Sequence, residues 1–568
     1  SARHFSPHYS TFDNTFIYDE TNKIVAVPLT NDIPSINLPE NDMVELEEEK
    51  KEKDDKKDEG IKTKIDFENF EARMSILDIP HGNYGALTSV KGKLIFFSFE
   101  NNGTPGVPLK YYDIKERKVE MIIDDIRFFE LSANGEKVLI RKGNSYGVVD
   151  IKKGASLEDK LPTNELKMIV DPKQEWTQLF NDAWRLERDF FYDKNMHGVD
   201  WKAMKKKYSA LLEGAVTRWD VNFVLGELIG EMNASHTYVG GGDRETPERL
   251  SVGYLGVDWE VSNGHYRIKS IVDAGAWNPE DRSPLAMPGV NVKEGEYILE
   301  VNGQALDIAM EPYHAFQGFA GKTVELLVNG KASKDGARRV IVECLRSEHR
   351  LRHLAWIEKN RKMVEEATDG QVGYIYVANT GINGQNELMR QYVGQREKAG
   401  LIIDERFNSG GQIPDRFIEL LNRKPLVYWA VRDGQTWSWP PQAHLGSKVM
   451  LTNGWSGSGG DAFPDYFQKN QVGPVIGTRT WGGLIGLSGA PGLIDGGRVT
   501  IPTFRMYNPD GSWFKEGVGV TPDIEIWEDP TVLAKGGDVQ VEKAIEVMME
   551  ILKKNPGGIP EHAPYEER

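Results

Sequence analysis

One serine in a glycine-rich turn could act as a nucleophile. Ser458 lies in the run WSGSGG, between an expected strand at 448–452 and an expected helix at 461–469. A serine at such a junction presents its hydroxyl at the end of a sheet, where the helix N-terminus favours developing negative charge. Glycine and serine are also common in turns for conformational reasons alone. The local pattern is therefore compatible with a nucleophile at Ser458 but does not require one.

Two other turns could supply the remaining groups of such a site. Gly410 and Gly411 follow an expected strand at 400–404, and adjacent parallel strands would bring this turn beside Ser458. Two backbone N–H groups there could form an oxyanion hole, in which one donor is commonly worth about 10²–10³ in rate. His236, in the run NASHTY, is the candidate general base among eleven histidines. Because a lone histidine is more often a surface or core residue, these residues permit a Ser–His hydrolase and leave the choice open.

The first part of the chain is predicted to be rich in β-strands. Residues 62–160 show short strand-like runs separated by Gly, Asn and Pro, a pattern typical of β-propeller blades. They suffice for about two blades, whereas a closed propeller has at least about four. The chain also begins at Ser1 without Met, so we expect it to be the back portion of a longer protein, or to be completed by a partner chain. The almost wholly charged run at 45–59 predicts a solvated loop or linker at 45–61, with an interaction tail as the alternative.

Helical periodicity begins near residue 172. Apolar side chains recur on one face of the first helix: Trp176, Phe180, Ala183, Trp184 and Phe191. Further helices are expected near 201–212 and 221–232. We interpret the aromatic stripe as core packing rather than as a cofactor site.

Residues 250–346 return to a β-rich pattern that resembles a PDZ domain. The run GEYILEVNG at 295–303 predicts a strand closed by an Asn-Gly hairpin turn. About forty residues earlier, the run GYLGV at 253–257 stands in the place of the PDZ carboxylate-binding loop. Such a loop offers backbone N–H groups to a peptide C-terminus, which makes Gly256 a candidate substrate-binding residue.

Strands and helices alternate over residues 355–530. Besides the strands already named, we expect strands at 372–377 and 475–477 and helices at 387–398 and 416–422. This order predicts an α/β domain with a mostly parallel sheet, in which functional groups collect beyond the carboxyl ends of the strands.

Four runs in fixed order resemble the tricorn protease family. They are DERFNSGG from Asp404, NGWSGSGGDAF from Asn453, GTRTWGG from Gly477 and EGVGVTPD from Glu516. The resemblance implies a multidomain α+β fold with a partial β-propeller, a helical module, a PDZ-like domain and a crotonase-like α/β catalytic domain. The expected limits are 1–44 for propeller strands or an extension, 62–160 for blades, 170–248 for the helical module, 250–346 for the PDZ-like domain, 355–530 for the catalytic domain and 531–568 for a C-terminal helix and tail.

The resemblance also assigns roles by position. Ser458 would be the nucleophile and His236 the general base, while Ser235 and Glu516 would orient and support the imidazole, as a tetrad in place of Ser-His-Asp. The backbone N–H groups of Gly411 and Gly459 would form the oxyanion hole, with Gly410 beside the substrate.

The chain departs from the family pattern at two positions. Gly459 stands where the tricorn protease has Asp, which keeps the backbone donor but removes a carboxylate. Trp429 stands where that enzyme has an acidic residue that favours basic side chains at the cleavage position. We therefore expect Trp429 to contact substrate and to favour apolar or small residues over Lys and Arg. The related carboxyl-terminal processing proteases use a Ser–Lys dyad. The corresponding run here, TWGGL from Thr480, contains no lysine.

Together these features predict a serine peptidase that cleaves short peptides or unfolded polypeptide. The alternatives are a non-catalytic scaffold that binds peptides and a crotonase-type acyl-transfer enzyme. The family implies no metal and no organic cofactor, and a homohexamer. The formal charge of −17 argues against nucleic acid as a partner, the single cysteine excludes an intramolecular disulfide, and no apolar run is long enough to span a membrane. We expect a cytoplasmic location, with export as the alternative.

Overall fold

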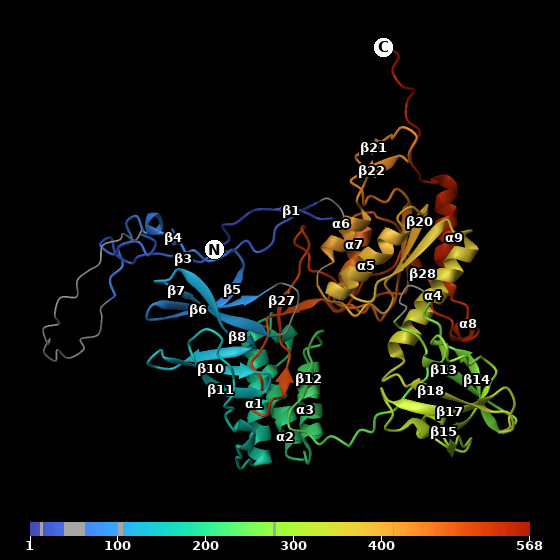
Figure 1. Ribbon diagram of the computed structural model, residues 1–568, viewed down its shortest axis with the longest axis horizontal. Coiled ribbons are helices and arrows are strands. Elements are labelled where there is room, and N and C mark those ends of the chain that lie inside the picture. Colours follow the sequence, from blue (N-terminus) through green and yellow to red (C-terminus); the bar gives the residue numbers. More distant parts are fainter. Residues whose placement is uncertain (12–14, 39–62, 100–105, 276–279, 413) are drawn as a thin grey trace. The chain divides into compact units, whose positions relative to one another are not determined.

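The computed structural model describes residues 1–11, 15–38, 63–99, 106–275, 280–412 and 414–568. The charged run at 45–59 therefore lies outside the described residues. The chain divides into two compact units, Ser1–Ile169 and Val170–Arg568. Both are shown in Figure 1, and each is described by itself.

The first unit consists of short antiparallel sheets. A four-stranded meander comprises β5 (Asn83–Val90), β6 (Lys93–Phe99), β7 (Val107–Asp113) and β8 (Lys118–Ile126). A three-stranded sheet follows, with β9 (Phe128–Leu131), β10 (Lys137–Lys142) and β11 (Ser145–Asp150). Two small ladders precede them: β1 (His8–Tyr9) with β2 (Phe16–Ile17), and β3 (Val25–Ala26) with β4 (Ser75–Ile76). Ile95, Leu109 and Val138 point into one buried cluster shared by the two larger sheets. Phe96 and Tyr112 point to the opposite face of the meander and are buried in a second cluster.

The second unit begins with three helices. They are α1 (Pro172–Phe190), α2 (Trp201–Leu212) and α3 (Arg218–Gly230). Each starts at an N-cap whose side chain accepts backbone N–H groups: Asp171, Asp200 and Thr217. All five side chains of the predicted stripe are buried in one cluster, which confirms that the aromatics pack as core.

A mostly antiparallel sheet follows, over the PDZ-like region. It contains β13 (Val257–Ser262), β14 (His265–Ile271), β15 (Tyr297–Val301), β16 (Gln304–Ala305), β17 (Thr323–Asn329) and β18 (Arg338–Glu343). Asn302 and Gly303 have φ of +49° and +79° between β15 and β16, so the predicted Asn-Gly hairpin turn is confirmed. Cys344 is buried in the core of this region, and burial raises the pKa of its thiol to about 11.

The remaining part is an α/β domain around a five-stranded sheet. Its strands are β19 (Val372–Tyr376), β20 (Gly400–Asp404), β23 (Ser447–Thr452), β24 (Val475–Gly477) and β28 (Ile524–Glu525), in that order and all parallel. One face packs against α5 (Ile382–Gln395), α6 (Asp415–Leu421) and α7 (Gly459–Lys469), the other against α4 (His349–Ala367) and α9 (Val539–Lys554) (Figure 1). The short α8 (Pro530–Ala534) precedes α9. The predicted parallel sheet is therefore confirmed.

Three two-stranded ladders lie at the margins of this domain. They pair β12 (Val239–Gly240) with β26 (Arg498–Val499), β21 (Val427–Trp429) with β22 (Trp437–Trp439), and β25 (Ile485–Leu487) with β27 (Pro502–Arg505). None was expected from the sequence, because strands of two to four residues carry no clear periodicity.

Helix α5 begins five residues earlier than the sequence pattern indicated. The side chain of Asn379 accepts the N–H groups of Gly381 and Gly384, at 2.9 and 3.2 Å, and so satisfies donors that the first turn would leave free. The pattern alone missed this start because a glycine-rich first turn lacks apolar periodicity.

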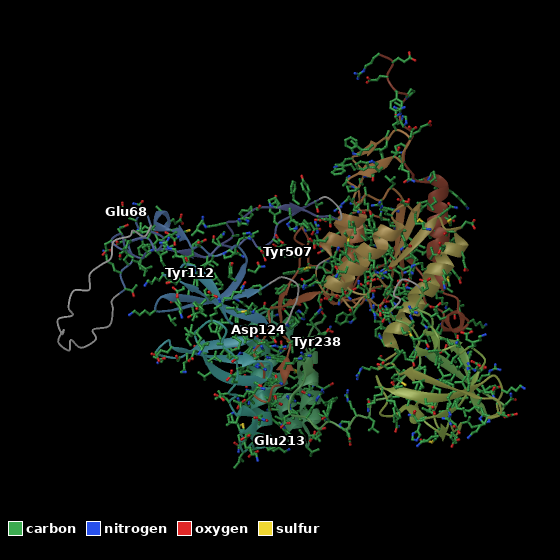
Figure 2. All side chains as sticks on the ribbon, viewed as in Figure 1. Glu68, Tyr112, Asp124, Glu213, Tyr238 and Tyr507 are labelled. Atoms are coloured by element: carbon green, nitrogen blue, oxygen red, sulfur yellow. The ribbon has the colours of Figure 1, made fainter. Side chains whose placement is uncertain are left out.

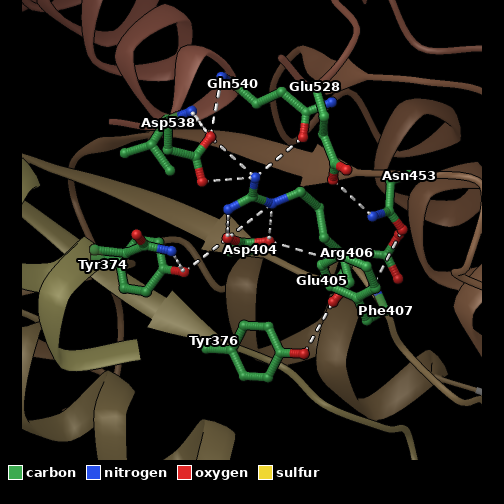
Figure 3. Close-up of polar contacts among 12 residues, drawn as sticks. Tyr374, Tyr376, Asp404, Glu405, Arg406, Phe407, Asn453, Glu528, Asp538 and Gln540 are labelled. Atoms are coloured by element: carbon green, nitrogen blue, oxygen red, sulfur yellow. Dashed lines mark hydrogen bonds and ion pairs between the residues drawn. The ribbon is translucent and has the colours of Figure 1, made fainter. Parts of the chain in front are cut away.

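A buried arginine ties the end of β20 to the start of α9. Arg406 is 1% exposed, and its guanidinium donates to the carboxylates of Asp404 and Asp538, at 2.6 and 2.9 Å (Figure 3). Asp538 is also the N-cap of α9. The two carboxylates raise the pKa of Arg406 well above its ordinary value. This cluster anchors the turn that leads directly to Gly410 and Gly411.

We predict that Arg406→Met destabilises the α/β domain by about 3–5 kcal/mol, because it leaves two buried carboxylates without a cation. Urea unfolding followed by tryptophan fluorescence measures this as a lower midpoint. Arg416→Met is the matched control, since Arg416 pairs with Glu419 at the surface. Equal midpoints for the two variants would contradict the prediction.

Candidate active site

Ser458 lies between β23 and α7 in a strained backbone conformation. Its φ and ψ are +58° and −116°, a region that residues with a Cβ seldom occupy. The N–H of Ser458 donates to the carboxylate of Asp461, at 2.8 Å, which holds the turn in place. Nucleophilic serines occur in such strained turns between a strand and a helix.

The glycines around Ser458 are required by close packing. A Cβ added at Gly457 would lie 2.6 Å from the ring of Trp481, and one added at Gly460 would lie 2.8 Å from the carbonyl oxygen of Asn408. At Gly459 it would lie 2.1 Å from Oγ1 of Thr380. An aspartate at this position could not fit unless Thr380 moved, which gives a physical reason for glycine there.

His236 meets Ser458 although 222 residues separate them. His236 Nε2 lies 3.1 Å from Ser458 Oγ, within hydrogen-bonding distance. On the other side of the ring, His236 Nδ1 lies 3.0 Å from Ser235 Oγ. If Nε2 is to accept the proton of the Ser458 hydroxyl, Nδ1 must carry the ring hydrogen and donate it to Ser235 Oγ. The structure therefore brings three of the predicted residues into one line of contacts.

Glu516 completes this line through the backbone. Its carboxylate accepts the N–H of Ser235 at 2.9 Å and the N–H of Leu484 at 2.8 Å. It thus fixes the segment that carries the imidazole rather than contacting the Ser235 hydroxyl. Burial lowers the pKa of His236, and the nearby carboxylates of Glu516 and Asp461 partly offset that effect.

The loop that carries His236 is held between the helical module and the α/β domain. Leu493, Val499 and Ile501 pack into the same buried cluster as the three helices. Arg218 on α3 and Asp495, both 2% exposed, form an ion pair of 2.6 Å. Since β12 also pairs with β26, the position of His236 depends on contacts from both regions.

Two backbone N–H groups in the turns around Ser458 have no acceptor within the described residues. A Cβ added at Gly410 would lie 2.6 Å from Cβ of Ser458, which confirms that the turn after β20 adjoins the turn after β23. Gly410 itself is engaged, because its N–H donates to Asn408 and its carbonyl accepts the N–H of Thr380. Across the described residues, by contrast, the N–H groups of Gly411 and Gly459 have no hydrogen-bond partner. They are available to an oxyanion.

Three family descriptions match parts of this chain. Residues 172–230 match the tricorn protease C1 domain, 253–347 the tricorn protease PDZ domain and 371–526 peptidase family S41. The chain is 30% identical over 566 residues to the tricorn protease of Thermoplasma volcanium, and 30% identical over 592 residues to tricorn protease homolog 1 of Streptomyces coelicolor. These matches cover 98% and 99% of this chain but 53% and 54% of the relatives. A crystal structure of the tricorn protease matches with a TM-score of 0.85 and 26% identity, covering 97% of this chain and 53% of that one.

The chain belongs to the tricorn protease family. The resemblance seen in four short runs is therefore confirmed, and the S41 match makes this a family of serine peptidases. The chain spans about half the length of the relatives it matches.

Two aromatic side chains flank the imidazole in this tricorn-family site and were not named from the sequence. The ring centroids of Trp481 and Tyr238 lie 5.8 and 6.1 Å from that of His236. Trp481 is 44% exposed and Tyr238, labelled in Figure 2, is 51% exposed. Trp481 belongs to a run that carried the family resemblance, so its position beside the site could have been suspected from that run.

Asp461 was also missed, although the sequence carried a signal for it. Its carboxylate accepts N–H groups of Ser458, Gly482 and Gly483 and the hydroxyl of Thr480. An acidic residue three positions after a serine at a helix start is typical of a capping box. Asp461 therefore links the turn at Ser458 to the turn that carries Trp481.

Two other predicted substrate-binding residues lie elsewhere in this family member. Trp429 stacks on Trp437, with ring centroids 5.7 Å apart, and is 52% exposed on the β21–β22 hairpin, far from β12 and β27 in Figure 1. Gly256 is buried, and a Cβ there would lie 2.6 Å from the side chain of Leu351 on α4. Neither is brought to Ser458 within this chain, so their contacts with substrate stay predictions.

Within the residues that the structure describes, no group of three or more His, Cys, Asp or Glu side chains could hold a metal ion. None of the helices in the described ranges is both long and apolar enough to cross a membrane.

Proposed function

We propose that this chain is a serine peptidase of tricorn type that cleaves short peptides or unfolded polypeptide. The observation that carries the proposal is the 3.1 Å contact between His236 Nε2 and Ser458 Oγ, beside two unused backbone donors. A nucleophile, a base and an electrostatic site for the oxyanion are the three parts that acyl transfer requires.

In the proposed mechanism, Ser458 Oγ attacks the carbonyl carbon of the scissile bond while His236 Nε2 takes the hydroxyl proton. The N–H groups of Gly411 and Gly459 donate to the oxyanion of the tetrahedral intermediate. Its collapse breaks the C–N bond, and His236 returns the proton to the leaving amine. Water, deprotonated by the same imidazole, then hydrolyses the acyl-enzyme. Ser235 and Glu516 hold the ring in the required tautomer and orientation.

The finer features of the architecture belong to the same proposal. We assign the two larger sheets of the first unit to propeller blades, in keeping with their antiparallel strands, and the parallel sheet around Ser458 to a crotonase-like domain. The domain limits expected from the sequence agree broadly with the ranges matched by the C1, PDZ and S41 families. A homohexamer and peptide binding by the PDZ-like domain are carried over from the family resemblance. A cytoplasmic location is proposed from the single cysteine, which fits a reducing compartment.

We also propose that the enzyme prefers apolar or small residues over Lys and Arg at the cleavage position. The half-exposed rings of Trp481 and Tyr238 beside His236 support an apolar wall near the scissile bond. A peptide series that differs only at this position measures the preference as kcat/KM. The highest value for the Lys or Arg peptides would refute it.

A fluorophosphonate probe tests the proposed function directly. We expect covalent labelling at Ser458, located by mass spectrometry of the digested protein, together with hydrolysis of unfolded casein. A peptide-binding scaffold would neither react nor hydrolyse. A crotonase-type enzyme would turn over acyl thioesters and would not need His236, so thioester turnover by His236→Ala would favour that alternative.

The pH profile provides a separate prediction. The general base must be neutral, and burial lowers the pKa of His236 below its ordinary 6.5. As the pH rises through this lowered pKa, kcat/KM should rise to a plateau. The plateau should be reached at a lower pH than for an exposed histidine. Glu516→Gln removes a carboxylate that raises this pKa, so the acid limb should move to lower pH. The plateau value of kcat/KM should also be lower in this variant.

Initial-rate measurements over a pH series give the acid limb of the unmodified chain and of Glu516→Gln. Glu550→Gln, on the exposed face of α9, is the matched control and should leave the profile unchanged. An acid limb above pH 6.5, or a limb that Glu516→Gln moves upward, would contradict the proposed base.

A further inference from the structure

A cavity lies at the opposite end of β23 from Ser458. It has a volume of about 670 Å³ and lies between the segment after α6, the start of β23 and the residues that follow α9. Four basic residues line it: Arg423, Lys424, His444 and Lys448. We call this set the basic pocket. Its lining contains no Asp or Glu, although the chain carries a formal charge of −17.

Lys448 is buried in the basic pocket without a compensating carboxylate. It is 7% exposed, and its ammonium donates to the carbonyl oxygen of Gly446 at 3.1 Å. No Asp or Glu in the described part of the chain forms an ion pair with it. Burial alone lowers its pKa to about 8. A desolvated ammonium without an anion is costly, so an anionic occupant of the pocket would stabilise it.

His444 adds an acceptor to this set of donors. It is 4% exposed, and its Nε2 contacts the carbonyl oxygen of Lys398 at 2.9 Å. A carbonyl only accepts, so Nε2 carries the ring hydrogen and Nδ1 is a lone-pair acceptor. Among the described residues, Nδ1 has no partner. Burial and the neighbouring Lys448 lower the pKa of His444 to about 4, although contacts with the backbone of Lys398 and Gly446 partly offset this. The imidazole is therefore neutral at pH 7.

An occupant of the pocket would meet the cationic side chains of Lys424 and Lys448 and the edge of His444, whose Nδ1 is unpartnered. A sulfate or a carboxylate carries only acceptor oxygens at neutral pH and would leave Nδ1 of His444 unpaired. Hydrogen phosphate and a phosphomonoester monoanion carry both anionic oxygens and a P–OH group. The anionic oxygens can accept from Lys448 and Lys424 while the P–OH donates to Nδ1. Matching every buried polar group in this way favours binding.

We propose that the basic pocket binds a protonated phosphate group. Because Lys448 stands at the start of β23 and Ser458 follows its end, the bound group lies away from the catalytic turn. The proposal does not depend on peptidase activity and is tested by binding alone.

Isothermal titration calorimetry of the full chain with inorganic phosphate, and with sulfate at matched ionic strength, tests the proposal. We expect saturable phosphate binding in the millimolar range or tighter, at least about tenfold stronger than sulfate binding. O-phosphoserine as a second titrant distinguishes a free anion from a phosphate group carried on a larger molecule, which binds only if the cavity admits its organic part.

Two variants and one control complete the experiment. Lys448→Met should weaken phosphate binding at least about tenfold. Lys424→Glu reverses the charge of an exposed side chain and disturbs no buried contact. It should also weaken phosphate binding. Lys535→Ala removes an exposed lysine outside the pocket and should leave binding unchanged. Absence of saturable phosphate binding, equal affinity for sulfate, or unchanged binding in both pocket variants would overturn the proposal.

Discussion

Ser458→Ala is expected to lower kcat for peptide hydrolysis by at least about 10⁴-fold while the protein stays folded. Among the described residues, the hydroxyl that contacts Nε2 of His236 is that of Ser458, whereas the hydroxyl of Ser235 contacts Nδ1. No adjacent group can therefore replace the nucleophile. Residual catalysis would come from the backbone donors of Gly411 and Gly459.

The companion variant His236→Ala should show a comparable loss. The double variant should be scarcely worse than either single variant, because groups that act as one unit are not additive. Ser209→Ala, on α2, is the matched control and should retain full activity. Circular dichroism and thermal unfolding establish that each variant is folded. Retention of more than about a tenth of the activity in Ser458→Ala would exclude this serine as the nucleophile.

Gly411→Ala is expected to lower kcat by about 10²–10³-fold, with a smaller effect on KM. Gly411 has φ of +142°, which side chains with a Cβ rarely adopt. Its added Cβ would lie 2.6 Å from the backbone nitrogen of Gly381 and 2.9 Å from the carbonyl carbon of Thr380. Backbone atoms cannot move aside as a flexible side chain can, so the turn must shift and carry the oxyanion donor away.

Gly492→Ala is the matched control in the same domain. The nearest atom to its added Cβ is 3.8 Å away, and we expect activity and stability close to those of the unmodified chain. Steady-state kinetics on one peptide substrate, with thermal unfolding of each variant, separate a displaced donor from a failure to fold. A folded Gly411→Ala with full kcat would show that this N–H is not an oxyanion donor.

Local pattern was sufficient to predict most regular elements. The stripe from Trp176 to Phe191, the Asn302-Gly303 turn and the strands at the centre of the parallel sheet all appear close to where periodicity indicated. Such elements are specified by neighbouring residues, because their burial follows the helical or strand repeat. The short ladders were missed because their pairing partners determine them, and the early start of α5 because the Asn379 cap determines it. Neither feature produces a periodic pattern of apolar residues in the sequence.

The candidate site was predictable only in part from its own residues. Local spacing allowed Ser458 and the turn at Gly410 and Gly411, because both follow strands of one parallel sheet. It did not select His236 over the other histidines. That choice came from the family resemblance, and in the structure His236 Nε2 lies 3.1 Å from Ser458 Oγ across 222 residues of sequence.

The amino-acid sequence by itself determined the order of the elements, the parallel sheet and the glycine-rich turns at its carboxyl edge. It also sufficed, through four short runs, to identify the family. Only the tertiary structure decided that His236 reaches Ser458, that Glu516 acts through the backbone of Ser235, and that Trp481 and Tyr238 flank the imidazole. It also placed Lys448 and His444 in one cavity without a carboxylate. The reason is physical: these relations join segments far apart along the chain, and packing between the helical module and the α/β domain, not local conformational preference, sets their distances.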